Sequence, residues 1–304
     1  MGEMSKPKFQ LDDVKAHARG KWDMIFPQFA ITMPPKKRHS PCPACGGSDR
    51  FRYDDKKEMG DFYCNGCGAG DGFELISRCT NLSFPQVLEE VAAIVGLTPD
   101  TKITDVDRKR WKKEADMRER IRIEEEEKIH KNAARKAQSM WRSTHQSNDC
   151  AYLERKQVPN IGCIINHEGD LIVPLYDECG DMWNLQFIKH DGEKIFLKGG
   201  RVKGCFHFIG TVDLQDPIIC IAEGYATAAS IHLATGLPVA VAFNAGNLMP
   251  VGMAIRINNP TARLVYCADD DSAKENTGLN CANEAVAVTG GVVLLPKFEH
   301  GAAA

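Results

Sequence analysis

The chain has 304 residues, of which 43% are hydrophobic and 26% charged, values that are ordinary for a globular protein of two or three domains. No apolar run approaches the about 18 residues of a membrane span. The polar start, residues 1–10, lacks the apolar core of a secretory signal. We therefore expect a cytoplasmic protein with no membrane partner. The net charge of −3 excludes a uniformly basic chain, so any nucleic-acid surface has to be local.

The first predicted region, residues 1–100, contains a cysteine cluster flanked by two short helical patterns. Two Cys-x-x-Cys pairs are separated by residues 46–63, which is the spacing of a four-cysteine zinc site. A glycine follows each pair and permits the positive φ that a tight knuckle requires. We expect one zinc ion that the region needs for folding, because so short and polar a segment has little core. The predicted ligands are Cys42, Cys45, Cys64 and Cys67.

Three alternatives to this zinc site are four unrelated thiols, a redox pair, or a site in which His39 replaces one cysteine. A redox pair is disfavoured because two pairs are present and no βαβ pattern surrounds them. The remaining eight of the 12 cysteines are scattered, several within apolar runs. That distribution is typical of buried free thiols.

The segment between the two cysteine pairs has a pattern that suits nucleic-acid binding. In a strand, Arg50 and Arg52 share one face, while Phe51 and Tyr53 share the other. Arginines can contact phosphates, and aromatic rings can stack on unpaired bases. Packing of the two rings inside the ribbon is an equal alternative. The arginine face is therefore the stronger nucleic-acid candidate.

The second predicted region, residues 101–149, is dense in Arg, Lys and Glu and has few strand formers. This composition predicts one long, largely solvated helix over about 104–146 that links two domains. A disordered charged spacer is the alternative. Ahead of this region, Ser83 is expected to cap a helix that ends before Gly96.

The last two regions, residues 150–216 and 217–304, predict a small α+β subdomain followed by a doubly covered parallel sheet. The subdomain has short strand-like runs at 171–175, 184–188 and 206–209. In the last region, apolar strands at 218–222, 239–243, 264–268 and 292–295 alternate with helical patterns near 226–235, 248–257 and 279–289.

Two of these predicted parallel strands end in acidic residues. Glu223 follows the first, and Asp269, Asp270 and Asp271 follow the third. Ligands bind at the carboxyl ends of strands in open α/β sheets, and clustered carboxylates suit Mg²⁺ or Mn²⁺. Asp269 and Asp271 can point the same way while Asp270 points elsewhere, which makes Asp270 the weaker metal ligand. Such a site suits phosphoryl transfer. Acidic helix caps or turns are the alternative.

The sequence from Glu223 to Ala228, EGYATA, followed by Asp269-x-Asp271, resembles the Toprim domain of bacterial primases, type IA and II topoisomerases and some nucleases. The cysteine motifs and the run 171–177 resemble the zinc ribbon and the start of the catalytic core in DnaG-type primases. The chain is thus similar to Toprim-type DNA primases of the phage-satellite and conjugative-plasmid branch. DnaG-type zinc sites carry histidine where Cys45 stands, which favours that branch.

The resemblance implies a primase-type nucleotidyltransferase that makes short RNA primers from ribonucleoside triphosphates on single-stranded DNA. It implies that Glu223 is the catalytic acid or base and that Asp269 and Asp271, with Glu223, hold catalytic magnesium. It further implies phosphate contacts by basic residues of the subdomain, namely Lys198, Arg201 and Lys203.

The resemblance also implies a replicative helicase as partner, in trans or as a further C-terminal domain. The chain contains no Gly-x-x-x-x-Gly-Lys-Ser/Thr loop for an ATP-driven helicase of its own. The alternative functions are a Toprim nuclease or topoisomerase, and a catalytically silent zinc-dependent accessory that binds single-stranded DNA. The intact acidic set argues against the silent accessory.

Overall fold

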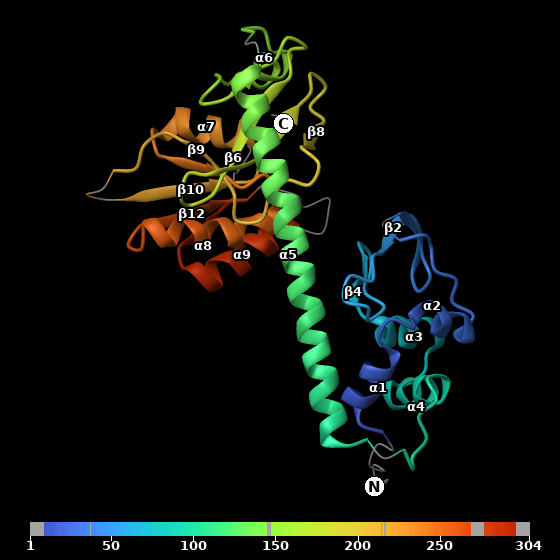
Figure 1. Ribbon diagram of the computed structural model, residues 1–304. Coiled ribbons are helices and arrows are strands. Elements are labelled where there is room, and N and C mark those ends of the chain that lie inside the picture. Colours follow the sequence, from blue (N-terminus) through green and yellow to red (C-terminus); the bar gives the residue numbers. More distant parts are fainter. Residues whose placement is uncertain are drawn as a thin grey trace. The chain divides into compact units, whose positions relative to one another are not determined.

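The computed structural model describes residues 9–36, 38–101, 103–144, 147–213, 215, 217–268 and 277–295. The chain divides into two compact units, Met1–Ile123 and Glu124–Ala304 (Figure 1). Among the described residues, no helix combines the length and the apolar character that crossing a membrane requires.

The first unit is a four-stranded antiparallel ribbon with short helices packed against it. The ribbon consists of β1 (His39–Cys42), β2 (Gly46–Tyr53), β3 (Phe62–Cys64) and β4 (Gly68–Gly70), in that order. The helices are α1 (Leu11–Ala18), α2 (Trp22–Ile25), η1 (Phe26–Phe29), α3 (Gly72–Thr80) and α4 (Phe84–Ile94). The predicted zinc ribbon is thus confirmed as a fold.

Local signals explain where the helices of the first unit begin. Asp71 accepts a hydrogen bond from the Glu74 N–H at 3.1 Å and caps α3. The Ser83 N–H donates to Gln86 Oε1 at 2.9 Å at the start of α4, as the sequence predicted for Ser83. Gly72 is required where α3 meets α2, because a Cβ atom there would collide with the Trp22 indole.

The predicted charged helix is confirmed as α5 (Asp105–Ser143), which begins in the first unit and ends in the second. A capping box opens it, since the Asp107 N–H donates to Thr104 Oγ1 and the Thr104 N–H donates to Asp107 Oδ2. Its buried residues in the described part are three alanines of the second unit. Ala133, Ala134 and Ala137 pack there, and most of the helix is exposed to solvent.

The second unit contains a small antiparallel sheet preceded by α6 (Ala151–Lys156). The strands run in chain order, β5 (Ile164–Ile165), β6 (Leu171–Tyr176), β7 (Met182–Ile188) and β8 (Lys194–Phe196). Alternate residues of β6 serve two cores, as the period of two requires. Ile172 packs with Ala137 of α5, whereas Val173 belongs to the core that contains α7 residues.

The second sheet of this unit has the order β13-β12-β10-β11-β9. Its parallel strands are β10 (Ile218–Ala222), β11 (Val239–Val241), β12 (Arg263–Cys267) and β13 (Val292–Leu294), and β9 (His207–Ile209) pairs antiparallel with β11. The four parallel strands confirm the predicted sheet. The run 206–209, which contains β9, was predicted as part of the small subdomain, because so short a run contains no signal for its partner strand.

Helices cover both faces of the parallel sheet (Figure 1). They are α7 (Tyr225–Thr235), α8 (Leu248–Asn258) and α9 (Thr277–Thr289), with the short η2 (Ala245–Asn247) before α8. Along β10, Cys220 and Ala222 face the core of α7, whereas Ile219 and Ile221 face the core of α8 and α9. Burial on both sides explains the continuous apolar run of this strand.

Candidate functional site: a four-cysteine centre and an acidic sheet edge

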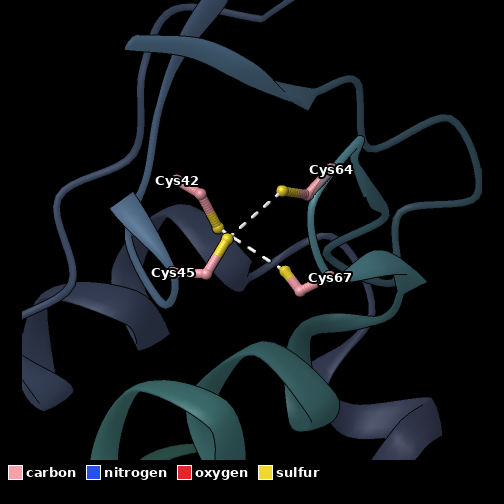
Figure 2. Close-up of side chains that lie close together, drawn as sticks. All are labelled: Cys42, Cys45, Cys64 and Cys67. Carbon is pink, nitrogen blue, oxygen red and sulfur yellow. Dashed lines mark hydrogen bonds between the residues drawn. The ribbon is translucent and has the colours of Figure 1, made fainter. Parts of the chain in front are cut away.

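The four predicted zinc ligands converge at one point of the ribbon (Figure 2). The Sγ atoms of Cys42 and Cys67 lie 3.7 Å apart, those of Cys45 and Cys64 lie 3.6 Å apart, and all four lie within 4.8 Å of one another. A tetrahedral zinc ion with Zn–S bonds of about 2.3 Å separates its sulfurs by about 3.8 Å. The cluster therefore has the geometry and the donor chemistry of a structural zinc site.

Backbone and side-chain donors stabilise negative charge at this cluster. Burial raises the pKa of the Cys64 thiol, but N–H groups of Gly66 and Cys67 outweigh burial and lower it to about 7. Burial and the neighbouring thiols raise the pKa of Cys67 to about 12, and Arg78 acts against that increase. Arg78 also donates to the Cys67 carbonyl at 2.6 Å. The sequence prediction missed Arg78, which lies in a helix beyond the cysteine motif.

His39 does not replace a cysteine in the described cluster. It lies on exposed β1, where its Nδ1 donates to the Asp49 carbonyl at 2.8 Å. The structure thus excludes the alternative in which His39 is the fourth ligand and retains Cys45, the residue that departs from the DnaG-type pattern.

The two faces of the ribbon differ as the alternation of β2 predicts. Phe51 and Tyr53 are 0% and 1% exposed, so they pack in the core and cannot stack on bases. Arg52 lies on the solvent face, opposite His39 on one neighbouring strand and Tyr63 on the other. Tyr63 is 49% exposed and is the accessible ring that the sequence prediction missed. We call His39, Arg50, Arg52 and Tyr63 the ribbon face.

Arg50 on the ribbon face bends over the two cysteine knuckles. A Cβ atom at Gly47 or at Gly66 would collide with its guanidinium group, so both glycines make room for this side chain. Its positive charge therefore lies over the loops that carry the thiolates, while the residue as a whole stays exposed to solvent.

The second predicted site lies at the carboxyl edge of the parallel sheet. Glu223 follows the last residue of β10 and is half-buried. In the register of β10 and β12, Ala222 is opposite Cys267, so the two strands end at the same level. Asp269, Asp270 and Asp271 lie outside the described residues, but they follow Ala268 directly in the sequence. The described end of β12 therefore lies at the edge of the sheet where Glu223 lies.

A lysine of the other sheet approaches the same edge. A Cβ atom on Gly224 would lie 3.3 Å from Nζ of Lys194, the first residue of β8. This places an ammonium group beside the Glu223-Gly224 turn and the first turn of α7. The resemblance placed Lys194 at the start of a basic stretch, but nothing local in the sequence links residue 194 to residue 224.

The three basic residues predicted to contact phosphates differ in their surroundings. Lys198 and Lys203 are exposed. Arg201 lies over the Trp183 ring at 5.1 Å and 3.9 Å from the Asp177 carboxylate, which fixes its guanidinium. The structure thus leaves two solvated cations and one oriented cation in this loop.

A buried amide fixes the loop that carries these cations. Asn247, 3% exposed, donates through Nδ2 to the carbonyls of Val202, Cys205 and Ala242 at 3.1, 3.0 and 2.8 Å. Its Oδ1 accepts from the Gly204 N–H at 2.8 Å. One side chain therefore ties the loop on both sides of Lys203 to the end of β11.

Two parts of the sequence match known domain families. Residues 37–73 match the zinc-binding domain of primase-helicase, and residues 218–301 match the Toprim domain.

Two proteins of Escherichia coli named DNA primase TraC are similar to the chain. One is 36% identical over 193 residues, or 59% of this chain and 18% of that protein. The other is 34% identical over 156 residues, or 48% of this chain and 11% of that protein. The match thus covers less than a fifth of each relative.

Two solved primase structures align over most of the chain at low similarity. The primase fragment of the bacteriophage T7 primase-helicase protein covers 85% of this chain and 88% of its own, with 13% identity and a TM-score of 0.35. The zinc-binding and RNA polymerase domains of the Aquifex aeolicus primase cover 98% and 81%, with 16% identity and a TM-score of 0.31. The two domain matches and the two TraC relatives, by contrast, show that the chain combines a primase-type zinc ribbon with a Toprim domain and is homologous to DNA primase TraC, which confirms the resemblance found in its sequence.

Proposed function

We propose that this chain, with its primase-type zinc ribbon and Toprim domain, is a DNA primase that makes short RNA primers on single-stranded DNA. The observation that supports this most directly is the register of β10 and β12. Because both strands end at one level, Glu223 and Ala268, the last described residue before Asp269, lie at one edge of the sheet. A cluster of carboxylates there needs a cation to offset its charge.

Magnesium is the proposed cation, held by Asp269 and Asp271 with Glu223 beside them. When bound, it would offset the charge of the nucleotide phosphates. Glu223, half-buried at the end of β10, is proposed to accept the proton of the attacking hydroxyl. Lys194, Lys198 and Lys203 are proposed to bind and orient the triphosphate by charge.

The ribbon face is proposed to hold the DNA template. Arg52 and Arg50 offer charge to backbone phosphates, and Tyr63 offers a ring on which one unpaired base can stack. The buried rings of Phe51 and Tyr53 give the strand its rigidity. Zinc is needed indirectly, because it holds the knuckles against which Arg50 packs.

Substitution of the acidic residues tests the proposed chemistry. We expect that Glu223→Gln, Asp269→Asn and Asp271→Asn each reduce primer synthesis at least about a hundredfold, a loss typical of removing an acid, a base or a metal ligand. The measurement incubates the full chain with single-stranded DNA, labelled ribonucleotides and magnesium, and resolves the products on a gel. The control is Glu168→Gln, whose carboxylate is 60% exposed before β6 and has no proposed role.

Three results of this assay would contradict the proposal. Normal synthesis by all three acidic variants would place the active site elsewhere. Nicked DNA in place of new RNA would identify a nuclease. Tight binding of single-stranded DNA with neither synthesis nor cleavage would identify a silent accessory protein.

A further inference from the structure

A second charged feature of the first unit lies outside the zinc centre and the ribbon face. It is a cavity of about 870 Å³ between α1, the turn at Glu58 and Met59, and the first turns of α5. Figure 1 shows α1 beside the start of α5. Six cationic side chains line the cavity, namely Lys15, Arg19, Lys21, Arg108, Lys112 and Arg118.

Two ion pairs fix the walls and neutralise acidic groups inside the cavity. Arg108 of α5 makes a bidentate contact with Asp13 of α1, with both N–O distances at 2.9 Å. Asp13 is 6% exposed, so this pair joins the two helices firmly. Arg118 lies 3.5 Å from the Glu58 carboxylate and closes the side formed by the turn.

After these pairs are formed, positive charge predominates in the cavity. Arg19, Lys21 and Lys112 form no ion pair with any residue in the part of the chain that the structure describes. Besides Asp13 and Glu58, two acidic residues line the cavity. Glu114 lies 3.9 Å from Arg110, which is outside the cavity lining, and Asp12 is exposed to solvent. Arg19 donates only to a neutral acceptor among the described residues, the Lys57 carbonyl at 3.1 Å, so it keeps its net charge. Three such cations facing one carboxylate form a local anion-binding surface.

Two aromatic rings accompany this charge. Trp111 of α5 meets His17 of α1 edge to face, with ring centroids 4.8 Å apart and an interplanar angle of 80°. The His17 ring is held by its Nδ1, which donates to the Asp13 carbonyl at 2.9 Å. Both rings line the cavity and are only half-buried. A half-buried indole beside lysines is the arrangement on which an unpaired base can stack.

We propose that this cavity is a second binding site for single-stranded DNA, which holds template beyond the segment gripped by the ribbon face. Lys21, Lys112 and Arg19 would contact the phosphates, and Trp111 would stack on a base. A single strand is required because paired bases do not expose their ring faces. The inference rests on the proposed primase function in one respect only, namely that the bound strand is the template for primer synthesis.

Binding measurements on the full zinc-loaded chain test the proposal without requiring catalysis. The probe is a fluorescein-labelled oligothymidylate, and its anisotropy is measured over a range of salt concentrations. We expect that Lys21→Gln combined with Lys112→Gln reduces the slope of log affinity against log salt by about 1.4, or about 0.7 for each lost phosphate contact. Trp111→Ala should weaken binding about fivefold or more through the loss of one stacked base.

The matched control is Lys109→Gln combined with Lys113→Gln. These exposed lysines lie on the same turns of α5 but do not line the cavity. The control should keep the affinity and salt slope of the unmodified chain. Circular dichroism of each variant checks folding, and the lysine variants keep the test informative if Trp111→Ala unfolds.

Each outcome bears on the cavity separately from the proposed function. Unchanged affinity and salt slope in the cavity lysine variant would overturn the proposal, even if the chain makes primers. Equal losses in the cavity and control variants would also overturn it, because the effect would then be general charge. Weakened binding in the cavity variants alone would support the site, even in a chain that makes no primers. Quenching of Trp111 by ribonucleoside triphosphates without any effect on DNA affinity would assign the cavity to nucleotides and overturn the proposal.

Discussion

At the scale of single residues, alternate side chains of β2 stabilise the fold and provide the proposed DNA contacts. Successive side chains of β2 point to opposite faces, so Phe51 and Tyr53 enter the core while Arg50 and Arg52 face solvent. Replacing either ring would create a large core cavity and cost about 3–5 kcal/mol. Replacing either arginine leaves the core intact. The exposed face can therefore be studied without unfolding the first unit.

The four-cysteine centre allows a test at the same scale. We expect one zinc ion per chain, with most of it lost from Cys64→Ser, because the substitution removes one of four thiolates. The measurement is metal content after dialysis against a weak chelator. Acidification should release zinc from the unmodified chain, because protons compete for the thiolates.

The matched control for the zinc measurement is Cys79→Ser. Cys79 is a partly buried cysteine of α3 that packs against the same core but is not among the four converging thiols. It should keep a full equivalent of zinc. Equal zinc in both variants would contradict the assigned ligands.

At the scale of elements, the loop between β8 and β9 depends on a residue outside it. Asn247 of η2 donates to three carbonyls and accepts from one N–H, and of these the Val202 carbonyl also accepts from the Cys205 N–H. The loop also carries Lys198, Arg201 and Lys203. The conformation of this loop, and with it the position of the three cations, therefore depends on the side-chain amide of Asn247.

We expect Asn247→Ala to lower the free energy of unfolding of the second unit by about 3 kcal/mol or more, since each buried group left unpaired costs about 1–3 kcal/mol. Primer synthesis should fall further than stability explains, because the backbone on both sides of Lys203 is no longer held by Asn247. Denaturant titration and the synthesis assay measure the two effects. Asn283→Ala, on the exposed face of α9, should stay within about 0.5 kcal/mol of the unmodified chain. Equal stability of the two variants would show that the amide does not fix the loop.

At the scale of the whole molecule, the sequence predicted the elements well wherever local pattern determines them. The strand expected at 218–222 is β10 to the residue, since a strand covered on both faces is apolar throughout. The zinc ligands were predictable because two Cys-x-x-Cys pairs at this spacing can bring four thiolates to one metal ion. Ser83 marked α4 by its capping signal.

Contacts between distant segments could not be predicted in this way. Nothing in the sequence near Lys194 shows that it meets Gly224, and nothing near Asn247 shows that it holds residues 202–205. Tyr63 was missed because its exposure depends on the pairing of β3 with β2. In α5, the charge pattern predicted a helix but not the contact of Arg108 with Asp13.

We propose a division of labour within one chain, in which the ribbon face binds the template while the carboxyl edge of the Toprim sheet performs the chemistry. Starting a primer requires template and two nucleotides at once, a cost that a tethered grip offsets by effective concentration. Extending a supplied primer needs less of that help. The two activities should therefore respond differently to changes in the two units.

The most direct measurement compares de novo initiation with extension of a supplied primer by the full chain on single-stranded DNA. We expect Arg52→Gln combined with Tyr63→Ala to reduce initiation about tenfold or more while keeping most extension, and Glu223→Gln to lose both. Template-complementary RNA with a 5′-triphosphate identifies initiation. If the ribbon-face variant initiates as well as the unmodified chain, or if Glu223→Gln still extends primers normally, the two units do not divide the work in this way.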